Sequence, residues 1–131
     1  MASIFSKIIA GEIPCYKVAE NEEFLAFLDI FPLKKGHTLV IPKKEVDYIF
    51  DLDSATYEGL MNFSARVARA IGRVIDCKRV GVSVIGLEVP HAHVHLIPIQ
   101  GVHDMNFSNP KLQLTKEEFK AIAASIAAAF Q

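Results

Sequence analysis

Three histidines alternate with apolar residues in one short segment of the chain, Pro90-His91-Ala92-His93-Val94-His95-Leu96-Ile97-Pro98. Successive side chains of a β-strand point to opposite faces of its sheet. In an extended segment, His91, His93 and His95 therefore share one face, and the apolar residues between them pack on the other. Three of the five histidines of the protein gather here, which predicts a site that uses imidazole chemistry.

Mutual repulsion keeps these three imidazoles from all being protonated. Side chains two residues apart in a strand have Cβ atoms about 7 Å apart, and two cations at that distance repel by roughly 0.6 to 2.4 kcal/mol. Because a free histidine titrates near about 6.5, we expect at least one neutral ring at neutral pH beside a ring that donates a proton. A neutral nitrogen with neighbouring N–H donors suits nucleophilic attack on an anion.

Two other interpretations of the histidines stay open. Pairs of the type His-x-His chelate zinc, and His37, Glu88 and His103 are candidates for a further ligand. One strand rarely turns three successive side chains of the same face toward a single ion, so we favour a site without a metal. The histidines could also form a polar row on a half-exposed sheet with no chemical role.

The composition narrows the classes of function. The 131 residues suffice for one domain, which we place at residues 1–131. Fourteen basic and fifteen acidic residues give a formal charge of −1, which disfavours a nucleic acid polymer as partner. No secretory signal is visible, and no apolar stretch reaches the roughly 20 residues that span a bilayer. We therefore expect a cytoplasmic protein without a membrane partner, and free thiols at Cys15 and Cys77.

The pattern of apolar residues predicts five strands and three helices. Strands are expected at residues 16–20, 24–29, 37–41, 78–85 and 91–99. Helices are expected at residues 3–10, from Asp53 or Ser54 to about Ile75, and at about 115–130, where Thr115 and Glu118 form a capping-box signature. The buried face of the long helix is predicted to carry Leu60, Phe63, Val67, Ala70, Ile71 and Val74. Hairpin-like neighbours favour an α+β fold with a mostly antiparallel sheet.

Several segments resemble the histidine-triad (HIT) family of nucleotide-binding proteins, in its Hint-like branch. Residues 91–97 are similar to the family motif His-x-His-x-His followed by two apolar residues, and residues 3–14, 27–30 and 36–44 are similar in order and spacing. The resemblance implies an α+β HIT-like fold, a homodimer and a purine nucleotide substrate. It also implies hydrolysis or transfer of nucleoside 5'-monophosphate derivatives, of the phosphoramidate or dinucleotide type, through a covalent nucleotidyl-histidine, without a required cofactor.

The resemblance gives each matching residue a role. His93 matches the nucleophile that attacks the α-phosphorus, and His91 and His95 match residues that orient it and contact phosphate or leaving-group oxygens. His37 matches the fourth histidine of the family, and Asp29 matches the acid that binds the ribose hydroxyls. The positions that hold the base match apolar residues, which periodicity alone would assign to an ordinary core: Ile4, Phe5, Ile8, Phe27, Ile30 and Leu39.

The sequence departs from the family pattern at two places. Ser3 and Ser6 occupy the positions of a common Cys-x-x-Cys pair, so we expect no zinc site built on that pair. The loop before the histidines is short and holds Leu87, where glutamine is usual, and Glu88. Leucine donates no hydrogen bond and a carboxylate repels phosphate, so Ser83 or backbone N–H groups of the loop are candidate replacements. Two alternatives to the enzyme follow: a nucleotide-binding regulatory module with little turnover, and a zinc-dependent hydrolase.

Overall fold

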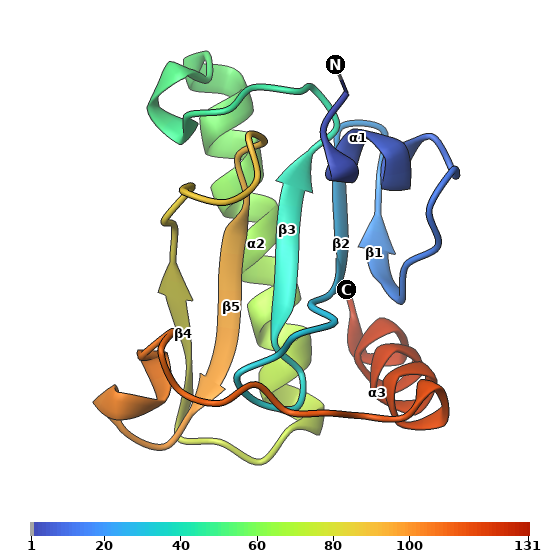
Figure 1. Cartoon of the computed structure of the whole chain (residues 1–131), viewed down its shortest axis with the longest axis vertical. Helices are drawn as coiled ribbons and strands as arrows, with labels where there is room; N and C mark the ends of the chain where they lie inside the picture. Colours follow the sequence, from blue (N-terminus) through green and yellow to red (C-terminus); the bar gives the residue numbers. More distant parts are fainter. Residues whose placement is uncertain (1) are drawn as a thin grey trace.

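The structure is a computed structural model that describes residues 2–131. Its centre is a five-stranded sheet in the order β1-β2-β3-β5-β4 (Figure 1). The strands are β1 (Lys17–Glu20), β2 (Phe24–Leu28), β3 (Thr38–Pro42), β4 (Arg79–Ser83) and β5 (Val94–Ile99). Every neighbouring pair is antiparallel. The predicted α+β fold with a five-stranded antiparallel sheet is confirmed.

The three predicted helices are present, and each begins at a side-chain cap. Ser3, Asp53 and Thr115 each accept a hydrogen bond from a backbone N–H of the first turn. Thr115 and Glu118 form the predicted capping box. The helices are α1 (Ile4–Ile9), α2 (Ser54–Val74) and α3 (Lys116–Ala129), and the sequence pattern did not indicate the two short 3-10 helices η1 (Ile49–Asp51) and η2 (Val102–Met105).

The larger hydrophobic cluster lies between the sheet and α2, which runs behind the strands in Figure 1. Five of the six side chains predicted for the buried face of α2 are buried: Leu60, Phe63, Val67, Ala70 and Ile71. The prediction for Val74 is wrong, since its side chain is 37% exposed. Val74 is the last helical residue, and the extended backbone of Ile75 directs the Ile75 side chain to the core instead.

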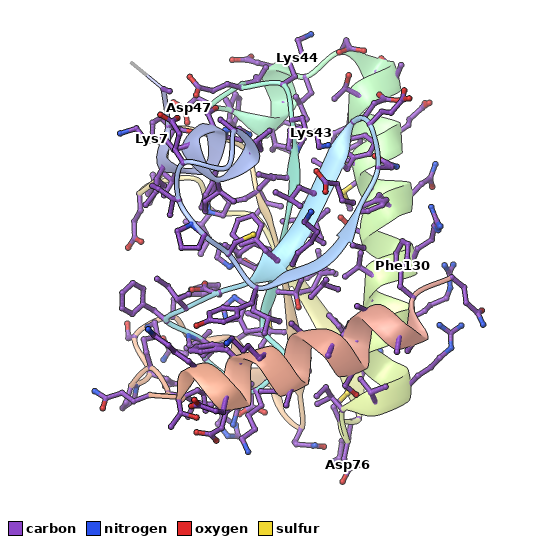
Figure 2. All side chains as sticks on the ribbon, turned by 90° about the vertical axis from the view of Figure 1, so that its right-hand side faces the viewer. Lys7, Lys43, Lys44, Asp47, Asp76 and Phe130 are labelled. Carbon is purple, nitrogen blue, oxygen red and sulfur yellow. The ribbon has the colours of Figure 1, made fainter. Side chains whose placement is uncertain are left out.

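The terminal helix α3 packs on α2 and β1 of the same chain, and Figure 2 shows it lying across their lower ends. The ring of Phe119 stacks on Tyr16 with a centroid distance of 4.9 Å. At the far end, Phe130 lies 5.5 Å from the ring of Phe63, and the guanidinium of Arg66 lies 4.6 Å from the Phe130 ring. The apolar face of α3 therefore packs within its own chain.

The opposite face of the sheet is covered by α1 and carries a smaller cluster of buried residues: Phe5, Leu25, Phe27, Leu39 and Ile41. Directly opposite residues of an antiparallel pair share a face. His95 pairs with Leu39 on one side and with Ser83 on the other. The side chain of His95 therefore lies on the face that α1 covers.

The strand β5 begins later than predicted. The alternating pattern predicts a strand over residues 91–99, whereas β5 begins at Val94, so His91 and His93 precede it. The backbone there bonds outside the ladder, because the N–H of Ala92 donates to the carbonyl oxygen of Val46. The prediction that one strand holds all three histidines is therefore wrong, and His95 alone of the three lies within β5.

Two expectations concern the whole chain. No helix among residues 2–131 is long and apolar enough to cross a membrane. Cys15 and Cys77 are free and half-buried, as expected, and burial raises the pKa of both thiols.

Candidate active site

A ring-to-ring hydrogen bond joins His37 and His95. The backbone N–H of Leu33 donates to Nδ1 of His37 (3.0 Å), and an N–H group can only donate. Neutral His37 therefore carries its hydrogen on Nε2, which donates to Nδ1 of His95 (3.0 Å). His95 in turn carries its hydrogen on Nε2. No hydrogen bond within residues 2–131 uses that N–H, so it is available to a ligand.

Burial keeps this pair neutral. Burial, with smaller contributions from the neighbouring His95 and from Lys111, lowers the pKa of His37 to about 3. Burial also lowers the pKa of His95 to about 4, with a smaller contribution from His93. Burial is therefore a larger cause of the neutral rings than the mutual repulsion expected from the sequence. At neutral pH both rings are in the neutral state that the hydrogen bonds require.

The ring of His93 is fixed by a backbone carbonyl. Its Nδ1 lies 2.7 Å from the carbonyl oxygen of His91, and a carbonyl can only accept, so Nδ1 carries the hydrogen. In the neutral ring, Nε2 of His93 then holds the lone pair. The rings of His93 and His95 adjoin, with centroids 5.0 Å apart. A ring nitrogen with a lone pair therefore lies next to an N–H donor, an arrangement that suits nucleophilic attack with stabilisation of developing negative charge.

His91 is fully buried behind this pair. Its Nε2 donates to the carbonyl oxygen of Pro42 (2.7 Å), which leaves Nδ1 to accept the hydroxyl proton of Ser3 (2.8 Å). Burial lowers the pKa of the His91 ring. Both ring nitrogens bond to the protein. This arrangement leaves neither nitrogen for a phosphate oxygen, and the orienting role of His91 stays a prediction.

Asp29 follows β2 and lies beside His37. One of its carboxylate oxygens accepts a backbone N–H bond, and the other is 3.5 Å from Nε2 of His37. Burial raises the pKa of this carboxyl group. One ligand atom each of Asp29, His37 and His95 lie within 4.8 Å of one another, so these residues could hold a metal ion. The set shares His37 and His95 with the ligands weighed from the sequence, and it includes neither Glu88 nor His103.

The buried members of the predicted base-binding set lie against His93. Phe5, Phe27 and Leu39 belong to the smaller hydrophobic cluster. The Phe5 ring meets the ring of Phe27 edge to face at 5.5 Å and that of His93 at 5.1 Å. The structure therefore brings α1, β2 and β3 together at one side of His93.

The other predicted contact residues lie at the surface of this cluster. Ile8 is half-buried and packs against it, whereas Ile4 and Ile30 are 49% and 55% exposed. Ser83, the last residue of β4, is half-buried and pairs with His95. The exposed apolar surface of Ile4 and Ile30 is available to cover a ligand.

A pocket of about 250 Å³ also adjoins His93. It lies between η1, the first turns of α2 and the segment that follows β4, and its aromatic lining residues are Tyr48, Phe50 and Tyr57. Of the predicted site residues, only His93 lines it. The predicted base-binding residues therefore lie outside this pocket.

The segments that build the site also identify the family. A family model described as the HIT domain matches residues 10–102, a span that includes Asp29 and the four histidines of the site. The chain belongs to the HIT family. Among its HIT relatives, an uncharacterized HIT-like protein of Borreliella burgdorferi is 37% identical over an alignment of 131 positions that covers 94% of each chain. The adenosine 5'-monophosphoramidase of Schizosaccharomyces pombe is 34% identical over an alignment of 128 positions that covers 96% of each chain.

Solved HIT structures share the whole fold. A Hit-like protein from Bartonella henselae aligns with a TM-score of 0.85 at 31% identity and covers 98% of this chain and 96% of its own. A zinc-bound histidine triad family protein from Mycobacterium smegmatis aligns with a TM-score of 0.81 at 27% identity and covers 98% and 93%. These alignments support the HIT-like fold that the sequence predicts.

Three residues beside the HIT site escaped the sequence analysis as functional candidates. The centroid of the Phe107 ring lies 4.9 Å from that of His95. The only feature of the sequence that could have indicated this residue is an aromatic side chain in a polar segment after β5. Ser3, considered only as a replaced cysteine, bonds to His91 across 88 positions of the chain. Glu45 accepts hydrogen bonds from the backbone N–H of Ser3 and the hydroxyl of Ser6. No local pattern indicates contacts over such separations.

Proposed function

We propose that this HIT protein hydrolyses or transfers the nucleoside 5'-monophosphate group of a phosphoramidate or phosphoanhydride through a covalent intermediate on His93. The observation that carries the proposal is the hydrogen bond from Nδ1 of His93 to the His91 carbonyl, which leaves the lone pair on Nε2. The name of the S. pombe relative, adenosine 5'-monophosphoramidase, supports an adenosine phosphoramidate as the test substrate.

The proposed reaction has two steps. In the first, Nε2 of His93 forms a bond to the α-phosphorus, and the bond from phosphorus to the leaving group breaks. The leaving group takes the bonding pair and a proton from solvent. In the second, water bonds to phosphorus and loses a proton, the bond to His93 breaks, and the nucleoside monophosphate departs. In both steps the Nε2–H of His95 donates to a phosphate oxygen as negative charge develops.

The nucleoside is proposed to lie on the α1 side of His93. Asp29 is partly exposed at the end of β2 and is the proposed acceptor for the ribose hydroxyls. The base, a purine in this proposal, lies against Phe5 and is covered by Ile4 and Ile30. An apolar slot with a few polar groups at its mouth is typical of small-molecule sites. The remaining proposed contacts are Ile8, Phe27, Leu39 and Ser83.

The active species is proposed to be a homodimer. β4 is an edge strand of the sheet, and exposed apolar side chains lie on it and near it: Val82, Val84, Ile85, Tyr48 and Phe50. An unpaired edge beside such a surface is suited to pairing with a second copy. Light scattering should give twice the mass of the chain, and Val82→Glu should give a monomer. A monomeric wild type would contradict this assembly.

One experiment tests the proposed reaction. Wild type and His93→Ala are incubated with adenosine 5'-phosphoramidate, with and without a chelator, and release of AMP is followed. We expect release by the wild type that the chelator leaves unchanged and that His93→Ala abolishes. Mass spectrometry of enzyme denatured during turnover at alkaline pH should detect a nucleotidyl group on His93. Turnover that never yields this adduct would refute the covalent mechanism.

The same experiment separates two rival functions. Leu87 is 87% exposed and offers no donor to a phosphate, and this favours the nucleotide-binding module with little turnover as the second candidate. Binding of AMP without turnover would support that module. Activity lost with the chelator would support a zinc-dependent hydrolase on Asp29, His37 and His95. The cytoplasmic location inferred from the sequence stays a prediction.

A further inference from the structure

A hydrogen-bonded cluster outside the proposed nucleotide contacts joins the start of α1 to the triad. Its members are Ser3, Ser6, Glu45 and His91. Oε1 of Glu45 accepts from the backbone N–H of Ser3 (2.8 Å) and from the hydroxyl of Ser6 (2.5 Å). Oγ of Ser3 accepts from the backbone N–H of Ser6 (3.0 Å) and lies 2.8 Å from Nδ1 of His91. Ser3 and His91 are 5% and 0% exposed.

The directions of these bonds follow from the groups that form them. A carboxylate can only accept, so the hydroxyl proton of Ser6 points to Glu45. Oγ of Ser3 already accepts from a backbone N–H, and its own proton is left for Nδ1 of His91. The carbonyl of Pro42 requires the hydrogen of His91 on Nε2, so Nδ1 is free to accept that proton. The Pro42 carbonyl thus fixes the tautomer of His91, and the Ser3 hydroxyl donates to the nitrogen that this tautomer leaves free.

The peptide group between His91 and Ala92 connects this cluster to the ring of His93. Its carbonyl oxygen accepts from Nδ1 of His93, and its N–H, that of Ala92, donates to the carbonyl oxygen of Val46. Val46 is the neighbour of Glu45 in sequence. The segment of residues 45–46 therefore holds the His91 ring through the serines and holds the adjoining peptide group directly. A shift of either would move the oxygen that orients His93.

We propose that Ser3 and Glu45 are positioning residues for His93, which act through the ring and the carbonyl group of His91. The proposal rests on the proposed function, in which Nε2 of His93 is the nucleophile. Neither residue touches the substrate. Their loss should lower kcat and leave KM unchanged, because the nucleotide contacts stay intact while the attacking nitrogen loses its alignment.

The test uses Ser3→Gly, because glycine replaces serine at a helix N-cap at a cost of only a few tenths of a kcal/mol. This change removes the hydroxyl from His91 and keeps the start of α1. We expect kcat to fall by about tenfold or more, with KM within about twofold of wild type. Asp53→Gly is the matched control, since it removes the N-cap side chain of α2, outside this cluster. It should leave kcat unchanged.

Glu45 offers a second matched pair. Glu45→Gln keeps an oxygen that accepts from Ser3 and Ser6, and it should keep kcat within about threefold of wild type. Glu45→Ala removes the acceptor and should lower kcat as Ser3→Gly does. Equal losses in both Glu45 variants would overturn the role of the acceptor oxygen. Unchanged kcat in Glu45→Ala would overturn the role of Glu45 altogether.

Nitrogen-15 NMR of the imidazoles gives a readout that does not depend on activity. In the wild type we expect His91 with its hydrogen on Nε2 and His93 with its hydrogen on Nδ1. In Ser3→Gly, the carbonyl oxygens of Pro42 and His91 keep these tautomers, and the Nδ1 resonance of His91 should shift because this nitrogen loses its hydrogen bond. An unchanged Nδ1 resonance of His91 together with unchanged kcat would overturn the proposal. If the wild type turns over no phosphoramidate, the proposed function fails, and the His91 resonance still decides whether Ser3 bonds to this ring.

Discussion

The two histidine pairs of the site consist of the same type of side chain but are held by opposite kinds of backbone group, a donor for one pair and acceptors for the other. The pair His37–His95 starts at an amide donor, the N–H of Leu33. The pair His91–His93 is set by carbonyl acceptors, since His91 donates to Pro42 and His93 donates to His91. The donor at one end and the acceptors at the other fix opposite tautomers in His95 and His93.

This difference explains how adjacent imidazoles acquire distinct roles without distinct residue types. His95 presents an N–H at Nε2, and His93 presents a lone pair at the same atom, with ring centroids 5.0 Å apart. Neither assignment depends on a charged residue beside the ring. A backbone amide or carbonyl has a fixed polarity at any pH, so it specifies a tautomer more strictly than a hydroxyl group can.

Removing the N–H donor of His95 should have the largest effect on kcat. His95→Ala deletes the N–H that would stabilise the phosphate oxygens in the transition state, and loss of one such donor costs about 10² to 10³ in kcat. The change should be measured as kcat on adenosine 5'-phosphoramidate. His103→Ala is the control, because this histidine lies at the surface. A His95→Ala enzyme with wild-type kcat would show that His95 is no donor.

Breaking the link between the backbone amide and His95 should have a smaller effect. His37→Phe keeps an aromatic ring and removes both hydrogen bonds, so His95 loses its fixed tautomer. We expect kcat to fall by about tenfold, and the unpaired N–H of Leu33 to lower the free energy of unfolding by about 1 to 3 kcal/mol. Imidazole nitrogen-15 shifts check the tautomer. A single Nε2–H tautomer of His95 in this variant would contradict the relay from Leu33.

The buried pair should also make stability depend on pH. The folded-state pKa values of His37 and His95, about 3 and about 4, lie below their ordinary value of 6.5. Between these values the unfolded chain binds more protons, so the free energy of unfolding falls as the pH drops from about 6.5 toward 4. For His95 alone the loss is on the order of 3 kcal/mol.

Urea unfolding at pH 7, 6 and 5 measures this dependence. The free energy of unfolding should depend less on pH in His37→Phe, because this variant has one buried ring fewer that must stay neutral. The dependence should be unchanged in His103→Ala, because this surface histidine lies outside the buried pair. A wild-type stability that is flat over this range would mean that the pair is protonated without cost.

Local patterns predicted the parts of the molecule that local physics determines. The caps at Asp53 and Thr115, the face of α2 and the antiparallel sheet follow from periodicity and turn residues over a few positions. The end of the ladder before Val94 does not, because it depends on the carbonyl of Val46 bonding to Ala92. The tautomers depend on contacts such as that between His91 and the carbonyl oxygen of Pro42, 49 positions apart.

The smallest expected effect concerns the loop that precedes His91. Leu87 is 87% exposed and lies where the family resemblance places a glutamine. Leu87→Gln adds an amide donor at a position where the resemblance implies a phosphate contact, and should raise kcat/KM on nucleoside phosphoramidates by about threefold to tenfold. Leu87→Met, which changes the shape of the side chain and adds no N–H, is the control. An unchanged kcat/KM in Leu87→Gln would mean that position 87 makes no contact in the transition state, and that the N–H of His95 serves there without its help.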